Sequence, residues 1–140
     1  DNAGKWIGIG GKVEAGEMPD ECNVREVMEE TGICLNSSHY YGVVHFRATT
    51  YEDEDMYLYS SDDFECPAEL EELLAANLGD EPENRLGCDE GELRWIRKDE
   101  LMGLPMWEGD KAFLQQILDG KESVAMTLQY VGEECTIIEE

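Results

Sequence analysis

One glutamate-rich segment, residues 11–33, constrains this chain more than any other feature. It reads GKVEAGEMPDECNVREVMEETGI. Pro19 suits the first turn of a helix, Asp20 and Glu21 favour the positive end of its dipole, and Gly32 suits its C-terminal stop. The segment therefore predicts a helix over residues 19–31, preceded by a glycine-containing loop.

The predicted helix has two different faces. At about 100° per residue, Glu26, Glu29 and Glu30 share one face. The opposite side carries the apolar stripe expected to face the core: Val24, Val27, Met28 and Thr31. Like charges at these spacings destabilise a helix by about 0.2–0.5 kcal/mol per pair. A hard divalent cation such as Mg²⁺, shared with substrate phosphates, would offset that cost.

The neighbouring residues fit the same interpretation. Arg25 lies four residues before Glu29 and can orient its carboxylate, while Gly10 and Gly11 let the backbone approach closely and offer a carbonyl. Glu17 can reach back to loop or arginine side chains. The alternative is a solvated acidic helix face, which is the usual explanation for an isolated ExxEE. The complete pattern is expected by chance on the order of once in 10⁷ windows, which favours the cation site.

The rest of the chain alternates strand and helix signals. Strands are predicted at 6–9, 40–47, 56–60, 92–96, 123–131 and 135–138, with a helical turn at 98–102 and a helix over 107–118. Residues 66–87 begin with helical leucine spacing and then become acidic, which is typical of a surface insertion. With 140 residues, the sequence indicates a single α/β (α+β) domain over residues 1–140.

Charge and cysteine content exclude several classes of protein. The chain has 34 acidic and 10 basic residues, a net charge of −24, and no basic cluster, which disfavours a nucleic-acid polymer as partner. A small phosphorylated substrate bridged by divalent cations is compatible with this charge. Five widely spaced cysteines without a CxxC pair indicate reduced thiols in a cytoplasm, and no apolar run predicts a membrane span.

The glutamate-rich segment resembles the Nudix box, G-x5-E-x7-R-E-U-x-E-E-x-G-U, at every defined position. WIGIGGK, CDEGELRWI and LPMWEGD look like the MutT-type 8-oxo-dGTP diphosphatases of Gram-positive bacteria. The resemblance covers most of the chain apart from the insertion at 66–87. It implies an α/β/α sandwich around a mixed β-sheet, whose first strand precedes WIGIGGK. Only five residues precede Trp6, so that N-terminal strand is expected to be missing from this chain or supplied by another segment or subunit.

The resemblance also implies roles for individual residues. Glu26, Glu29 and Glu30 would ligate Mg²⁺, or Mn²⁺ as the alternative ion, with the carbonyl of Gly10. Family members add an acidic residue from outside the box as ligand or base. Its best match here is Glu90, with Asp89 and Glu92 as alternatives. The catalytic set expected from the family is Glu26, Glu29, Glu30, Glu90 and the orienting Arg25.

The expected reaction converts a nucleoside triphosphate, such as the oxidised purine 8-oxo-dGTP, to the monophosphate and pyrophosphate. Lys12 and Arg47 are candidate phosphate contacts, with plain surface charge as their alternative. Trp107 is expected to stack on the base and Asp110 to accept hydrogen bonds from it; a core aromatic and a helix-capping acid are the alternatives. Ile7 stands where the animal enzymes carry an asparagine that binds the oxidised base.

Two broader alternatives remain at this point. One is a Nudix hydrolase of another nucleotide: an undamaged nucleoside triphosphate, a nucleotide sugar or ADP-ribose. The other is a non-catalytic binding module of the same fold, against which the intact REVMEE speaks. The protein is expected to be a cytoplasmic monomer or homodimer.

Overall fold

The computed structural model describes residues 8–50, 52–69, 71–72, 86–88, 91–93, 96, 98–132 and 134–139. These residues form two compact units. One, called here the core unit, takes in residues 39–60 and 102–140, and the other, the glutamate unit, takes in residues 8–38 and 61–101. Two strands, β1 (Cys34–Ala48) and β2 (Glu54–Glu65), run from one unit into the other.

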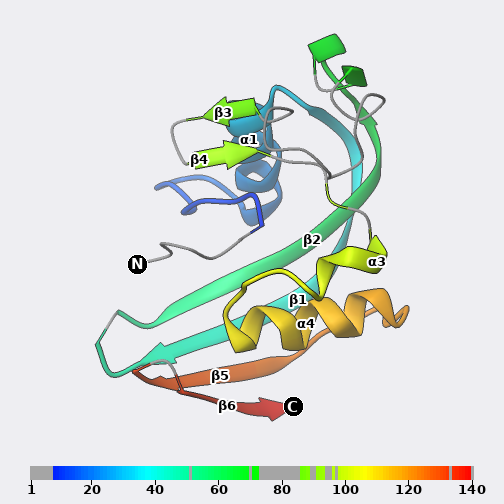
Figure 1. Cartoon of the computed structure of the whole chain (residues 1–140). Coiled ribbons are helices and arrows are strands. Elements are labelled where there is room, and N and C mark those ends of the chain that lie inside the picture. The colour runs from blue at the N-terminus through cyan, green and yellow to red at the C-terminus, as the bar shows by residue number, and fades with distance from the viewer. Residues whose placement is uncertain are drawn as a thin grey trace. The chain divides into compact units, whose positions relative to one another are not determined.

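A four-stranded mixed sheet is the framework of the core unit. Its strand order is β2-β1-β5-β6, where β5 is Met126–Val131 and β6 is Glu134–Glu139 (Figure 1). β1 pairs with β5 in parallel, from Val44 opposite Met126 to Ala48 opposite Tyr130. β5 pairs with β6 antiparallel across a turn at Gly132, whose φ of +65° is readily adopted by glycine.

Helix α4 (Glu108–Leu118) packs on this sheet, as Figure 1 shows. Alternate residues of β5 are buried because side chains of a strand point to opposite faces. The buried core comprises Val44, Phe113, Val124, Met126, Leu128 and Tyr130. The predicted mixed sheet with helices, an α+β fold, is confirmed.

The glutamate unit contains helix α1 (Pro19–Thr31), the short strands β3 (Leu86–Cys88) and β4 (Gly91–Leu93), and helix α3 (Lys98–Leu101). The bounds of α1 are those predicted from the sequence. Pro19 begins the helix, and Gly32 ends it in the left-handed conformation, φ +81°, donating its N–H to the carbonyl of Met28. Strand β3 pairs antiparallel with β4.

Several predicted bounds differ from the structure. β1 and β2 extend well beyond the predicted 40–47 and 56–60, while β5 begins at Met126 rather than residue 123. Gly8 and Ile9 lie outside any strand, so the strand predicted at 6–9 is not found in its described half, and residues 6–7 lie outside the described part. Of the predicted insertion, helical residues are described at 68–69 and 71–72.

The apolar stripe predicted for α1 is wrong in part. Val24 and Met28 are each 42% exposed, and the buried residue of the helix is Cys22. The covered side of the helix is the one that meets the preceding loop: the thiol of Cys22 lies 3.8 Å from the carbonyl oxygen of Gly11. The covered side of α1 therefore carries Cys22 rather than the apolar stripe, and the spacing of hydrophobic residues could not predict this.

Candidate functional site

Arg25 is the centre of the predicted site in the glutamate unit. Its guanidinium donates to Glu17 through Nε at 2.7 Å and Nη2 at 3.1 Å, a two-pronged pair with one carboxylate. Nη1 donates to Glu26 Oε1 at 2.7 Å and to Glu29 Oε2 at 3.0 Å. One planar cation thereby donates hydrogen bonds to three carboxylates from the loop and the helix, and the i, i+4 spacing predicted the one to Glu29.

Glu17 connects the helix to the loop before it. Besides accepting from Arg25, its carboxylate accepts the backbone N–H of Glu14 at 2.9 Å. The hydrogen bonds from Arg25, followed by the one from Glu14, lower the pKa of Glu17 to about 2. The same contact to Glu17 raises the pKa of Arg25. This pair is therefore ionised throughout the ordinary pH range.

The glycine loop lies directly against the glutamate face of α1. Gly10 donates its N–H to Glu30 Oε2 at 3.1 Å. A Cβ added at Gly11 would collide with the carboxylate of Glu26, so only glycine fits there without a shift. The backbone approach predicted from the glycine pair is present, and it brings peptide groups beside two of the three predicted ligands.

The chemistry of these residues fits a hard divalent ion, since carboxylate and backbone oxygens are the ligands that Mg²⁺ takes. The described hydrogen bonds with Arg25 engage Oε1 of Glu26 and Oε2 of Glu29. In the described part of the chain, however, no three acidic, histidine or cysteine side chains already converge as a metal site. In this structure Arg25 is the counter-charge of the Glu26 and Glu29 carboxylates.

Of the other residues predicted from the sequence, Lys12 belongs to the same loop. Its carbonyl oxygen accepts from Arg25 Nη2 at 3.1 Å, which ties the loop backbone to the helix. Glu90 and its alternative Asp89 lie outside the described residues, as does Ile7. For the alternative Glu92, within β4, only the backbone is described.

The two residues predicted to bind the base lie in the core unit at the start of α4. Trp107 precedes the helix, and its indole lies edge-on to the ring of Tyr130, with centroids 5.5 Å apart. Burial raises the pKa of Asp110 to about 6, well above its usual 3.8. The carboxylate of Asp110 is therefore half-buried and is not a fully solvated acid at the helix start.

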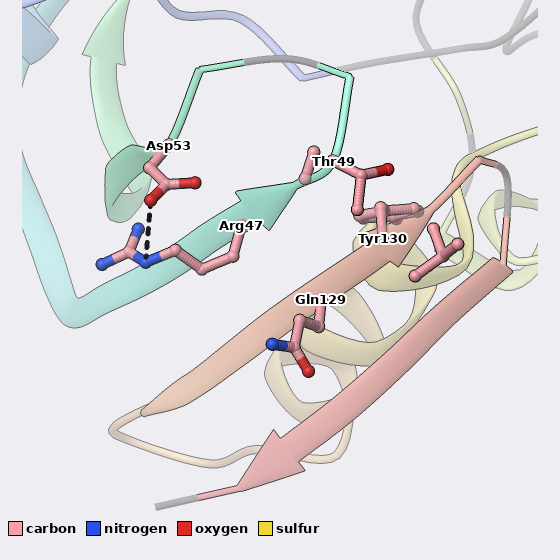
Figure 2. Close-up of a pocket in the computed structure, with 7 residues that line it drawn as sticks. Arg47, Thr49, Asp53, Gln129 and Tyr130 are labelled. Atoms are coloured by element: carbon pink, nitrogen blue, oxygen red, sulfur yellow. Dashed lines mark ion pairs between the residues drawn. The ribbon is translucent and has the colours of Figure 1, made fainter.

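Arg47 is already engaged by its neighbours. Its guanidinium donates to the carbonyl oxygens of Phe46 and Glu54 at 3.0 and 3.2 Å, and pairs with Asp55 at 3.3 Å and Asp53 at 3.8 Å. It lines a pocket of about 170 Å³ at the ends of β1 and β5, with Ala48, Thr49, Asp53, Gln129, Tyr130 and Val131 (Figure 2). This volume is below the roughly 300–1,000 Å³ of most ligand pockets.

Comparison with known proteins agrees with this geometry. The NUDIX domain family matches residues 1–117. The chain belongs to the Nudix family. It is 28% identical over 130 residues to an oxidized purine nucleoside triphosphate hydrolase of Danio rerio, covering 87% of this chain and 82% of the relative. It is also 27% identical over 137 residues to the uncharacterized Nudix hydrolase YvcI of Bacillus subtilis, covering 93% and 75%.

A solved structure is similar as well. The crystal structure of a mutator MutT protein from Bacillus halodurans superposes with a TM-score of 0.77 at 26% identity, covering 96% of this chain and 81% of that one. The protein is thus a Nudix hydrolase with the fold of MutT, as the sequence predicted. Nudix hydrolases generally use divalent metals such as Mg²⁺ and act on small nucleotide substrates. None of its described helices has the length and apolar composition needed to cross a membrane.

Sequence reasoning missed two residues of this Nudix hydrolase. Cys22 is buried against the glycine loop, and this burial raises the pKa of its thiol. Arg25 Nη2 lies 3.8 Å from its sulfur. Tyr130 contacts the start of α4 in the core unit. A small residue on the Arg25 side of α1 was a signal for the first. For the second, the strand predicted at 123–131 gave no indication of a polar contact.

Proposed function

We propose that this Nudix hydrolase cleaves a nucleoside triphosphate, an oxidised purine such as 8-oxo-dGTP in particular, to the monophosphate and pyrophosphate with Mg²⁺ as cofactor. The observation that carries the proposal is the pair of hydrogen bonds from Arg25 Nη1 to Glu26 and Glu29. They gather two helix carboxylates beside a glycine loop, whose Gly10 N–H contacts the third, Glu30. Such a set of oxygen ligands suits an ion shared with phosphates.

In this proposal Glu26, Glu29, Glu30 and the Gly10 carbonyl hold the metal, with Glu90 as a further ligand. Bound Mg²⁺ would neutralise phosphate charge and lower the pKa of a coordinated water. Arg25 keeps the carboxylates oriented, and Glu30 or Glu90 orients or deprotonates the attacking water. One water is consumed, the anhydride bridge between the α- and β-phosphates is cleaved, and the monophosphate and pyrophosphate are released.

The substrate class rests on different observations. The relative from Danio rerio is named an oxidized purine nucleoside triphosphate hydrolase. Trp107 and the half-buried Asp110 at the start of α4 offer a ring to stack on a purine and a carboxylate for its edge. Lys12 and Arg47 stay proposed phosphate contacts, and Arg47 would exchange part of its present ion pairing for phosphate.

A hydrolysis panel tests this proposal. We expect 8-oxo-dGTP to give the highest kcat/KM among 8-oxo-dGTP, dGTP, ADP-ribose and a dinucleoside polyphosphate, with pyrophosphate as the second product. Activity should require Mg²⁺ or Mn²⁺ and disappear with excess chelator. A higher kcat/KM for ADP-ribose or for the dinucleotide would assign the enzyme to another Nudix substrate class.

Glu29→Gln tests the metal site itself. We expect kcat to fall on the order of 100-fold, because a ligand is lost. The matched control is Glu72→Gln, an exposed glutamate of the helical residues 71–72 in the same unit, which should keep its activity. A wild-type protein that binds Mg²⁺ and nucleotide and turns over none of the panel would instead be a binding module.

A further inference from the structure

Helix α4 begins without a cap from its own sequence. Trp107 occupies the N-cap position, with φ −63° and ψ 144°, and provides no side-chain cap hydrogen bond. The first N–H groups of a helix have no partner within it and need one elsewhere when buried. Here the hydroxyl of Tyr130, on strand β5, accepts the N–H of Gly109 at 2.9 Å in a buried hydrogen bond.

The close approach that makes this bond requires glycine. A Cβ at position 109 would lie 2.5 Å from Leu128 Cδ1 and 2.8 Å from the Tyr130 hydroxyl oxygen. Backbone of the helix start therefore rests directly on two side chains of β5. A larger residue there would force the side chains of Leu128 and Tyr130, or the first turn of α4, to shift.

Tyr130 also contacts the indole that precedes the helix. Its ring is 4% exposed, stacks on Phe46 at 5.0 Å, and meets Trp107 edge-on at 5.5 Å. Burial raises the pKa of Tyr130, so the hydroxyl stays neutral and its oxygen can accept the Gly109 N–H. One side chain thus contacts both Trp107, by its ring, and the Glu108–Gly109 peptide in the first turn of α4, by its oxygen.

We propose that Tyr130 is a positioning residue for base recognition, which caps α4 from the neighbouring strand and thereby fixes the orientation of Trp107 and Asp110. This inference rests on the proposed function, since it takes those two residues as the contacts to the base. Tyr130 itself touches no reacting atom in this scheme. Its loss should weaken binding of the nucleotide and leave the chemical step intact.

Tyr130→Phe removes the cap while keeping the ring. We expect KM for the best nucleotide of the panel to rise about twofold to thirtyfold, the range that loss of a helix cap corresponds to. The change in kcat should stay within about twofold. The matched control is Tyr41→Phe. Tyr41 packs against the same core, and its hydroxyl lies 2.8 Å from Ser60 Oγ. The control should leave KM unchanged.

Amide exchange of Gly109, followed by NMR in the nucleotide-free protein, gives a readout that needs no activity. The amide should be protected in the wild type and in Tyr41→Phe, and should exchange faster in Tyr130→Phe. Faster exchange with an unchanged KM would overturn the positioning role, as would a fall in kcat alone. If the wild type bound no nucleotide, the proposed function would fail and the positioning role with it. The exchange data would then show only whether the cap exists.

Discussion

Glu17 keeps its negative charge into strong acid, because Arg25 and the Glu14 N–H both donate to its carboxylate. Its folded-state pKa of about 2 lies below the ordinary 4.5. A lowered pKa contributes stability that is present above pH 4.5 and is lost as the pH falls through 2. The ion pair of Arg25 with Glu17 thus stabilises the loop before α1 only while Glu17 is ionised.

Comparison of the wild type with Glu17→Gln tests this contribution by urea unfolding between pH 7 and pH 2. We expect the variant to be less stable at neutral pH, and the difference in unfolding free energy to shrink steadily below about pH 4.5. Glu72→Gln serves as the control. A difference that stayed constant down to pH 2 would contradict the assignment of the low pKa to Glu17.

Asp110 has the opposite shift, since burial raises its pKa to about 6. If its ionised carboxylate accepts hydrogen bonds from the base, kcat/KM should fall as the pH drops below about 6, and Asp110→Asn should lack this limb and bind the base less tightly. Unfolding free energies provide a second check. The stability of the wild type relative to Asp110→Asn should decrease as the pH rises from 3.8 through 6, because burial disfavours the charged form.

Among the elements, α1 begins at an unusual N-cap. Met18 has the extended conformation of a cap residue, φ −87° and ψ 154°, without a side-chain cap hydrogen bond, and is 64% exposed. Its N–H already donates to Glu21 Oε1 at 2.8 Å, which is the return half of a capping box. A serine in this position would supply the other half.

Met18→Ser is therefore expected to stabilise the protein by about 0.5–2 kcal/mol relative to Met18→Ala, measured by urea unfolding at neutral pH. The alanine variant controls for removal of the exposed apolar side chain. Equal stability of the two variants would show that the fold of the glutamate unit does not depend on the first turn of α1.

The elements also show what sequence could predict. Both long helices were expected with nearly their observed bounds, because Pro19, Gly32 and the apolar spacing of 107–118 act locally. β1 was predicted too short, since residues 36–40 in its first half are exposed and include Asn36, Ser37 and Ser38 in place of an alternating pattern. Exposed strand residues carry no periodic signal.

Within the candidate site, the motif spacing predicted the pairing of Arg25 with Glu29 and the approach of the glycine loop. The expected reach of Glu17 toward an arginine is present, whereas the contact of Arg25 with Glu26 and the exposure of Val24 and Met28 were not predicted. Those outcomes depend on tertiary packing between the loop and the helix, and the Tyr130 contact to Gly109 joins residues far apart in the sequence. The spacing of residues within one segment predicts neither kind of contact.

At the scale of the whole molecule, net charge is the dominant physical property. A charge of −24 on 140 residues repels itself in the compact state, and added salt screens that repulsion. Within residues 11–33, the Arg25 guanidinium alone pairs with several carboxylates. Repulsion among the remaining acidic residues is therefore left for dissolved ions to screen.

We expect the melting temperature at pH 7 to rise when NaCl is increased from 20 to 500 mM, because a more screened surface favours the folded state. The same addition near pH 4.1, where the sequence is neutral overall, should have a much smaller effect. A melting temperature that fell with salt at pH 7 would mean that attractive ion pairs such as those of Arg25 outweigh the general repulsion.

The Arg25 guanidinium serves several anions at once, and this has a consequence for mutational mapping. If Glu26 is neutralised, Arg25 Nη1 can donate to Glu29 alone, and if Glu29 is neutralised it can donate to Glu26 alone. Each single substitution will then understate the stabilisation that Nη1 provides, so that a double variant loses more than its two parents together. Because Glu26 and Glu29 share one counter-ion, the effects of substituting them are expected to be non-additive.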